Sequence, residues 1–108
     1  MAYDEGLAER IREHVDGFEP AERKMFGGLS FLVAGNLACG VIKDELIVRV
    51  GPEHFGSALK KKHARAFDFT GRPMKGWVTV APAGFEDDSD LASWVRMGLD
   101  FAATLPPK

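Results

Sequence analysis

The sequence predicts an α+β domain, a two-layer sandwich in which helices cover mainly one face of a five-stranded antiparallel sheet. Apolar residues recur at helical spacing near both ends of the chain, and between them they alternate in short runs joined by tight links. The expected order is helix, three strands, helix, two strands, helix, and such short links favour antiparallel pairing. Because 108 residues suffice for one core, we expect residues 1–108 to form a single domain.

The first helix is expected over residues 3–16. Leu7, Ile11 and Val15 recur every four residues with charged residues between them, which is the pattern of an amphipathic helix. Gly17 can take the left-handed conformation that commonly ends a helix. The helix should therefore bury one face and stop near this glycine.

Three strands are expected next, over residues 29–34, 37–42 and 46–50. Gly35 and Asn36 form a two-residue link between the first two strands, which predicts a hairpin. Apolar residues alternate along the third strand, so one of its faces should be buried.

Two adjacent glycines, Gly27 and Gly28, stand just before the first of these strands. Because glycine has no Cβ, they indicate a bend or a close approach by another part of the backbone. Two glycines are too few to form a phosphate-binding loop.

The second half of the chain predicts a short helix, two strands and a longer helix. Pro52 suits the first position of a helix expected over residues 52–62. Strands are expected over residues 66–70 and 77–80, because apolar residues alternate there on either side of a glycine-bounded loop. The last helix should follow capping residues 87–89 and end near residue 105, with its apolar residues on one side.

Composition excludes several classes of protein. Fourteen Lys and Arg against sixteen Asp and Glu give a net charge of -2, so direct nucleic-acid binding should be weak or absent. One cysteine permits no internal disulfide, and the chain begins without a basic and then apolar leader, so we expect a cytoplasmic protein. No apolar run approaches the length that crosses a bilayer, so we expect no contact with membranes.

No catalytic motif stands out among the nucleophilic and titratable residues. Cys39 alternates with apolar neighbours, so burial is its expected state, although a reactive thiol stays open as an alternative. His14, His54 and His63 lack the short spacing of metal ligands on one helix. We therefore expect no metal, no cofactor and no enzyme activity, with a small-ligand-binding protein or an enzyme as the alternative.

Cations are concentrated in one region, and we call the six residues concerned the basic surface. Such a cluster can contact phosphates or an acidic protein surface. The alternative is a solvated helix end, where cations suit the negative end of the helix dipole. The basic surface consists of Lys60, Lys61, Lys62, Arg65, Arg72 and Lys75.

Large aromatic side chains are expected to form much of the core. If helices leave one sheet face open, its apolar residues could be buried by a second copy, which makes a homodimer a further hypothesis. The aromatic residues concerned are Phe26, Phe31, Phe67, Phe69, Trp77 and Trp94.

Several segments together resemble the TfoX/Sxy amino-terminal domain, in particular its stand-alone bacterial members. They are KMFGGLSFLV at 24–33, GNLACGV at 35–41, LIVRVG at 46–51, FTGRPMKGWV at 69–78, and the helix around Trp94 with its LPPK end. The resemblance covers nearly the whole chain. It implies a two-layer α+β fold with an antiparallel sheet of the kind seen in secretion-chaperone-like proteins.

The resemblance also implies a function. Competence regulators of this family act as coactivators of a cyclic-AMP receptor protein at particular promoters, and they carry a carboxy-terminal domain that we do not expect in this chain. The chain is thus expected to be a non-enzymatic regulatory or adaptor domain with a protein partner, such as a cyclic-AMP receptor protein-type transcription complex. Weak duplex binding and a purely structural dimer are the remaining alternatives.

Overall fold

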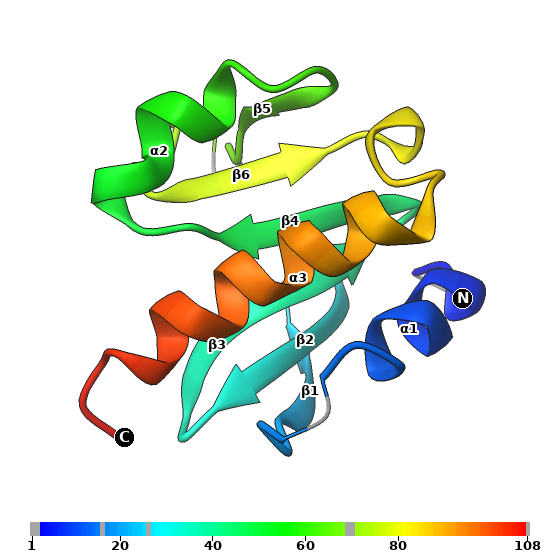
Figure 1. Ribbon diagram of the computed structural model, residues 1–108, viewed down its shortest axis with the longest axis vertical. Coiled ribbons are helices and arrows are strands. Elements are labelled where there is room, and N and C mark those ends of the chain that lie inside the picture. The colour runs from blue at the N-terminus through cyan, green and yellow to red at the C-terminus, as the bar shows by residue number, and fades with distance from the viewer. Residues whose placement is uncertain (1–2, 16, 26, 69–70, 108) are drawn as a thin grey trace.

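A computed structural model describes residues 3–15, 17–25, 27–68 and 71–107. Three helices lie on one face of a six-stranded antiparallel sheet (Figure 1), which confirms the predicted α+β class. In chain order the elements are α1 (Glu5–Arg12), β1 (Ala21–Met25), β2 (Gly28–Val33), β3 (Asn36–Ile42), β4 (Glu45–Arg49), α2 (Pro52–Leu59), β5 (Ala64–Ala66), β6 (Trp77–Val80), the 3-10 helix η1 (Pro82–Gly84) and α3 (Asp88–Ala103).

The sheet has six strands, so the prediction of five was wrong. The strand order is β1-β2-β3-β4-β6-β5, and every neighbouring pair is antiparallel. The strand that sequence reasoning missed is β1, which has the sequence AERKM and pairs with β2 at the edge of the sheet. An edge strand with four exposed residues needs no apolar face, so it shows no alternation that could predict it.

Several element boundaries also differ from expectation. The first helix, α1, ends at Arg12 and not near Gly17, and α2 ends at Leu59, three residues before the expected end at residue 62. The hairpin link is Ala34-Gly35, one residue earlier than predicted, with φ of 50° and 86°. Positive φ at both positions is the conformation of a type I′ turn, which matches the twist of the two strands. The strand expected over residues 66–70 is β5 (Ala64–Ala66), and Phe69 and Thr70 lie outside the described residues.

The core lies between the sheet and α3. Phe31, Cys39, Val48 and Val78 stand opposite one another across four strands, and all four side chains are fully buried. From α3, apolar side chains including Leu99 pack onto this row. The sheet therefore buries its row of apolar residues against the longest helix, as the alternating pattern predicted.

The aromatic side chains only partly follow the core prediction. Phe31, Phe67 and Trp94 are buried, but Trp77 is half-buried. Phe26 and Phe69 were also expected in the core, and both lie outside the described residues.

Among the described residues, the sheet face opposite the helices shows no open apolar patch. Ile47 and Thr79 on that face are buried. Among the described large apolar side chains, the exposed one is Leu59, which lies on α2 and has 36% of its surface exposed. The exposed apolar patch on which the homodimer hypothesis depended is thus not seen in the described residues, and the homodimer stays a prediction.

Gly28 confirms the close approach expected at the paired glycines. A Cβ on Gly28 would lie 1.9 Å from the carbonyl oxygen of Val41 on β3, so only glycine fits there. Gly27 has φ of 77°, which favours glycine as well. The two glycines let the chain turn from β1 into β2 directly against β3.

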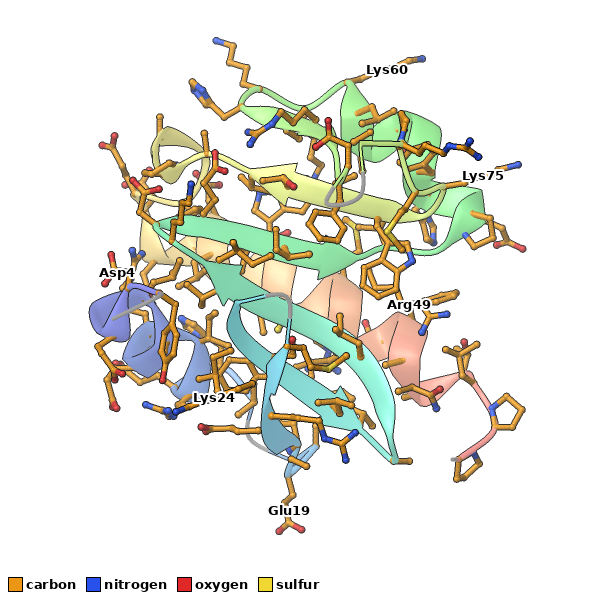
Figure 2. The ribbon with its side chains drawn as sticks, turned by 180° about the vertical axis from the view of Figure 1, so that it is seen from behind. Asp4, Glu19, Lys24, Arg49, Lys60 and Lys75 are labelled. Atoms are coloured by element: carbon orange, nitrogen blue, oxygen red, sulfur yellow. The ribbon has the colours of Figure 1, made fainter. Side chains whose placement is uncertain are left out.

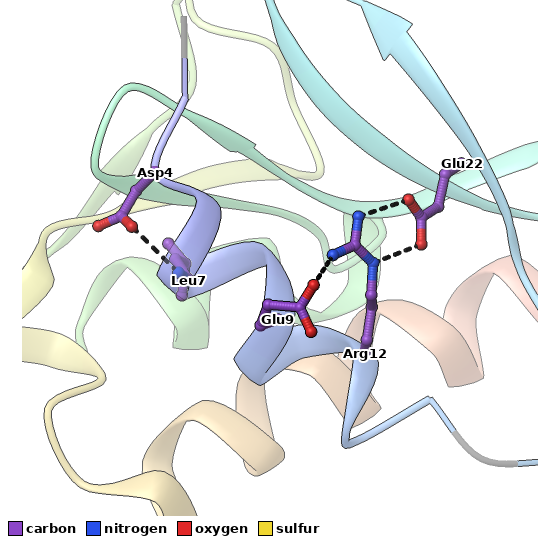
Figure 3. Close-up of polar contacts among 5 residues, drawn as sticks. All are labelled: Asp4, Leu7, Glu9, Arg12 and Glu22. Carbon is purple, nitrogen blue, oxygen red and sulfur yellow. Dashed lines mark hydrogen bonds and ion pairs between the residues drawn. The ribbon is translucent and has the colours of Figure 1, made fainter. Parts of the chain in front are cut away.

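Polar contacts attach α1 to the rest of the domain (Figure 3). The Asp4 carboxylate caps the helix by accepting a hydrogen bond from the Leu7 amide at 3.2 Å. Arg12 donates two hydrogen bonds of 2.7 Å to the Glu22 carboxylate on β1, and it also donates to Glu9. This ion pair joins the first helix to the edge strand.

Candidate partner-binding surface

The basic surface lies at the end of the molecule formed by α2, β5 and β6. Lys60 is the C-cap of α2, Lys61 and Lys62 follow in the next turn, and all three are exposed. Figure 2 shows Lys60 and Lys75 extending into solvent at this same end, with Lys24 at the opposite end. Arg72 and Lys75 are exposed in the loop before β6. Segments separated in the sequence therefore bring their cations to one end of the fold.

Arg65 differs from the other members of the basic surface. Its guanidinium donates two hydrogen bonds to the Glu45 carboxylate, at 2.7 and 3.0 Å, and this contact raises the pKa of Arg65. Within the described parts of the chain, the other five cations of the basic surface form no ion pair with a carboxylate. Arg65 is thus paired with a carboxylate, while the three lysines of the run, Arg72 and Lys75 have no such partner among the described residues.

A small hollow of about 300 Å³ opens beside Lys61 and Lys62. His63 and the η1 residues Ala83 and Gly84 complete one side of it. Asp90, Ser93 and Trp94 of α3 form the other side. The ammonium of Lys61 lies 4.9 Å from the centre of the Trp94 ring, which is a cation-π contact.

Sequence reasoning found the cations of this hollow but missed its other side. Trp94 was assigned to the core, and it is 4% exposed. Ser93 and Asp90 carry no motif, so no signal in the sequence could have placed them beside Lys62.

A larger hollow of about 460 Å³ lies between the start of α2 and the end of α3. Val50, Met97 and Phe101 supply its apolar lining, with the exposed side chains of His54 and Asp100 beside them. Its volume falls within the range of small-molecule sites. Nothing in the sequence predicted it, because its two sides are about fifty residues apart along the chain.

Next to this hollow, Arg49 lies between two aromatic rings. Its guanidinium is 5.1 Å from the centre of the Trp77 ring and 5.4 Å from that of Phe101. Figure 2 shows Arg49 near the end of β4, close to the last turns of α3. Phe67 stacks on Trp77, with ring centres 6.1 Å apart, so β4, β6 and α3 are joined by one continuous stack.

The burial expected for Cys39 is confirmed. Its side chain is fully buried, and burial raises the pKa of the thiol to about 12. A nucleophilic cysteine must be a thiolate, and at neutral pH this one is a protonated thiol within the core.

The three histidines occupy three separate places. His14 Nε2 lies 2.9 Å from Asp88 Oδ2, while His54 and His63 border the larger and the smaller hollow. Across the described ranges, no group of three or more His, Cys, Asp or Glu residues could hold a metal ion. The helices of these ranges are also too short or too polar to cross a membrane.

A family model described as the TfoX N-terminal domain matches residues 14–102 of the 108-residue chain. The chain belongs to the TfoX N-terminal domain family. A comparison with curated proteins finds no match. The resemblance carried by the MFGGLSF and GRPMKGW segments is thus confirmed.

The match to the TfoX N-terminal domain includes all six strands and the whole basic surface. The first helix, α1, precedes the matched residues. The Arg12 and Glu22 ion pair therefore joins a helix outside the matched range to a strand inside it.

Proposed function

We propose that this TfoX N-terminal domain is a non-enzymatic adaptor in transcription regulation that binds a protein partner through its basic surface. The observation that carries the proposal is a charge arrangement. Five cations of the basic surface form no ion pair with a carboxylate in the described residues, and Figure 2 shows two of them, Lys60 and Lys75, at the same end of the molecule. The full sequence has a net charge of -2. Such a local cluster attracts an acidic surface even when the whole molecule is slightly acidic.

An acidic protein surface suits this cluster better than a nucleic acid does. Five cations on a chain with a net negative charge provide a small electrostatic footprint, and duplex binding depends strongly on many phosphate contacts. Membership of the TfoX N-terminal domain family supports a regulatory role. A cyclic-AMP receptor protein-type transcription complex is therefore the first partner to test.

Fluorescence anisotropy tests this proposal. A labelled duplex that carries a receptor site is titrated with the chain, with and without the cyclic-AMP receptor protein, at low and at physiological salt. The double variant Lys60→Glu, Lys62→Glu reverses two charges of the basic surface. A matched control, Lys24→Glu with Lys43→Glu, makes the same charge change at exposed lysines elsewhere on the fold.

The proposal expects binding only when the receptor is present. The basic-surface variant should bind at least about tenfold more weakly, because like charges then oppose each other across the interface, while the control keeps wild-type affinity. Equal loss in both variants would contradict the assigned surface. Binding to the duplex alone that disappears with salt would overturn the adaptor in favour of direct DNA contact.

The larger hollow favours a second candidate function, a small-ligand-binding protein. Val50, Met97 and Phe101 offer an apolar lining within a volume suited to a small molecule. A fragment screen monitored at the Met97 methyl group by NMR tests this candidate. Fragments that shift the Met97 signal and lose binding in Phe101→Ala would support it, and a screen without shifts at Met97 would reject it.

A further inference from the structure

The smaller hollow is shaped by the backbone on one side. A Cβ on Gly84 would lie 2.5 Å from Val80 Cγ1 and 3.1 Å from the Cβ of His63, so glycine lets η1 lie close to the turn after α2. His63 has φ of 69°, and its carbonyl accepts a hydrogen bond of 2.9 Å from the Ala81 amide. This tertiary hydrogen bond holds a backbone conformation that non-glycine residues rarely adopt.

The side chains around the hollow are left free for a ligand. In the described chain, Lys62 and His63 make no side-chain hydrogen bond or ion pair. Lys61 faces the ring of Trp94, and a cation-π contact leaves its N–H donors available. Three nitrogen-bearing side chains thus border one small hollow, and none of them is hydrogen-bonded to a carboxylate in the described chain.

The size and charge of the hollow indicate which group it can hold. About 300 Å³ lies at the lower limit of small-molecule sites, so it suits the end of one side chain better than a cofactor. Two lysines and a single carboxylate, that of Asp90, line the hollow. An anionic group is favoured near Lys62 and repelled near Asp90, which gives the bound group a direction.

We infer that this hollow binds a carboxylate side chain from an acidic segment of the protein partner. The carboxylate accepts hydrogen bonds from Lys62 and Lys61, and the Ser93 hydroxyl can donate another. The inference rests on the proposed function, because it assigns one contact within the basic surface. It goes further by separating Lys62, which borders the hollow, from Lys60, which does not.

The test uses the full chain and a short fluorescein-labelled peptide in which glutamate alternates with serine. The same peptide with glutamine in place of glutamate is the control probe. Lys62→Glu reverses a charge at the hollow, and Lys60→Glu makes the same change at an exposed neighbour outside it. Ser93→Leu fills the hollow from an exposed helix position without changing any charge.

A second readout reports on the hollow itself. In a Trp77→Phe background, tryptophan emission comes from Trp94 alone, since the chain has two tryptophans. An unlabelled glutamate peptide that engages Lys61 should change this emission, because Lys61 lies over the Trp94 ring.

We expect Lys62→Glu and Ser93→Leu to weaken glutamate-peptide binding by about tenfold or more, and Lys60→Glu by much less. If both lysine variants lose peptide affinity equally and Ser93→Leu has no effect, the hollow is not the binding site. The proposed binding through the basic surface would remain supported in that case. Inorganic phosphate binding at Trp94 without peptide binding would also overturn it. Peptide binding at the hollow without receptor binding would support this site and reject the proposed partner.

Discussion

Gly98 of α3 lies directly against the backbone of Ala38 on β3. A Cβ placed on Gly98 would come within 2.3 Å of the Ala38 carbonyl oxygen and 3.2 Å of Val48 Cγ1. Figure 1 shows α3 passing across the sheet over β3 and β4. The missing side chain at Gly98 therefore sets how closely the helix can lie on the sheet.

Two helix glycines should respond in opposite ways to alanine. Gly98→Ala should lower the free energy of unfolding by about 1–3 kcal/mol, because its Cβ overlaps backbone atoms that cannot easily move. Gly56→Ala in α2 should raise it by roughly 0.5–1 kcal/mol, because a Cβ there meets nothing within 4 Å and alanine favours helix. Denaturant unfolding of both variants measures this. A Gly98→Ala variant as stable as wild type would show that α3 does not lie against β3 in this way.

The hairpin between β2 and β3 should be stabilised by a single substitution. Ala34 has φ of 50° beside Gly35, and asparagine tolerates that conformation better than alanine. Ala34→Asn should therefore raise the free energy of unfolding by on the order of 1 kcal/mol. Ala34→Val is the opposite control and should lower the melting temperature, whereas a stabilising valine would contradict the turn type.

The Arg12 and Glu22 ion pair should give a pH-dependent contribution to stability. The hydrogen bonds from Arg12 lower the pKa of Glu22 below its value in the unfolded chain. The stabilisation is therefore full above the unfolded pKa of about 4.3 and is lost as pH falls through the lower, folded pKa. Since both side chains are about one-third exposed, Glu22→Gln should cost about 0.2–1 kcal/mol at pH 7.

Denaturant unfolding from neutral to acidic pH measures this difference. The free energies of unfolding of wild type and Glu22→Gln should become equal at the acidic end of the pH range. Glu86→Gln changes an exposed carboxylate that forms no ion pair in the described chain, so it serves as the control. If the difference in free energy of unfolding between wild type and Glu22→Gln increased as pH falls, this would contradict the assigned ion pair.

Cys39 should react slowly in the native protein. Its thiol is fully buried in the core, and burial raises its pKa to about 12, so both access and thiolate formation are suppressed. A colour-forming disulfide reagent should label it rapidly only in denaturant. Native labelling at a rate near that of free cysteine would contradict the burial and would favour the reactive-thiol alternative.

Much of the fold follows from local pattern, and the exceptions have physical causes. The strand β1 escapes prediction because an exposed edge strand shows no apolar face. The hairpin link moves to Ala34-Gly35 with Asn36 inside β3, where Asn36 is buried and its amide donates to the Pro106 carbonyl at 2.9 Å. This contact across seventy positions also joins the segment after α3 to β3, a link that no local pattern in the sequence indicates.

The candidate surface shows the same division between local and tertiary information. The run of three lysines and the nearby Arg65 is evident in the sequence. Two other features depend on distances between separate elements. Arg65 pairs with Glu45, and Lys61 lies over the ring of Trp94.

The sequence by itself determined the α+β class, the family and the presence of a cluster of cations. Periodicity and turn propensity act between residues that are close along the chain, and the alternating residues of β2 to β4 and the apolar side of α3 carry that information. Tertiary structure alone decided which of the cations pairs with a carboxylate and where the two hollows open. Ion pairing and cavities depend on how closely distant segments pack, and glycines such as Gly84 and Gly98 set that spacing through contacts that no local pattern records.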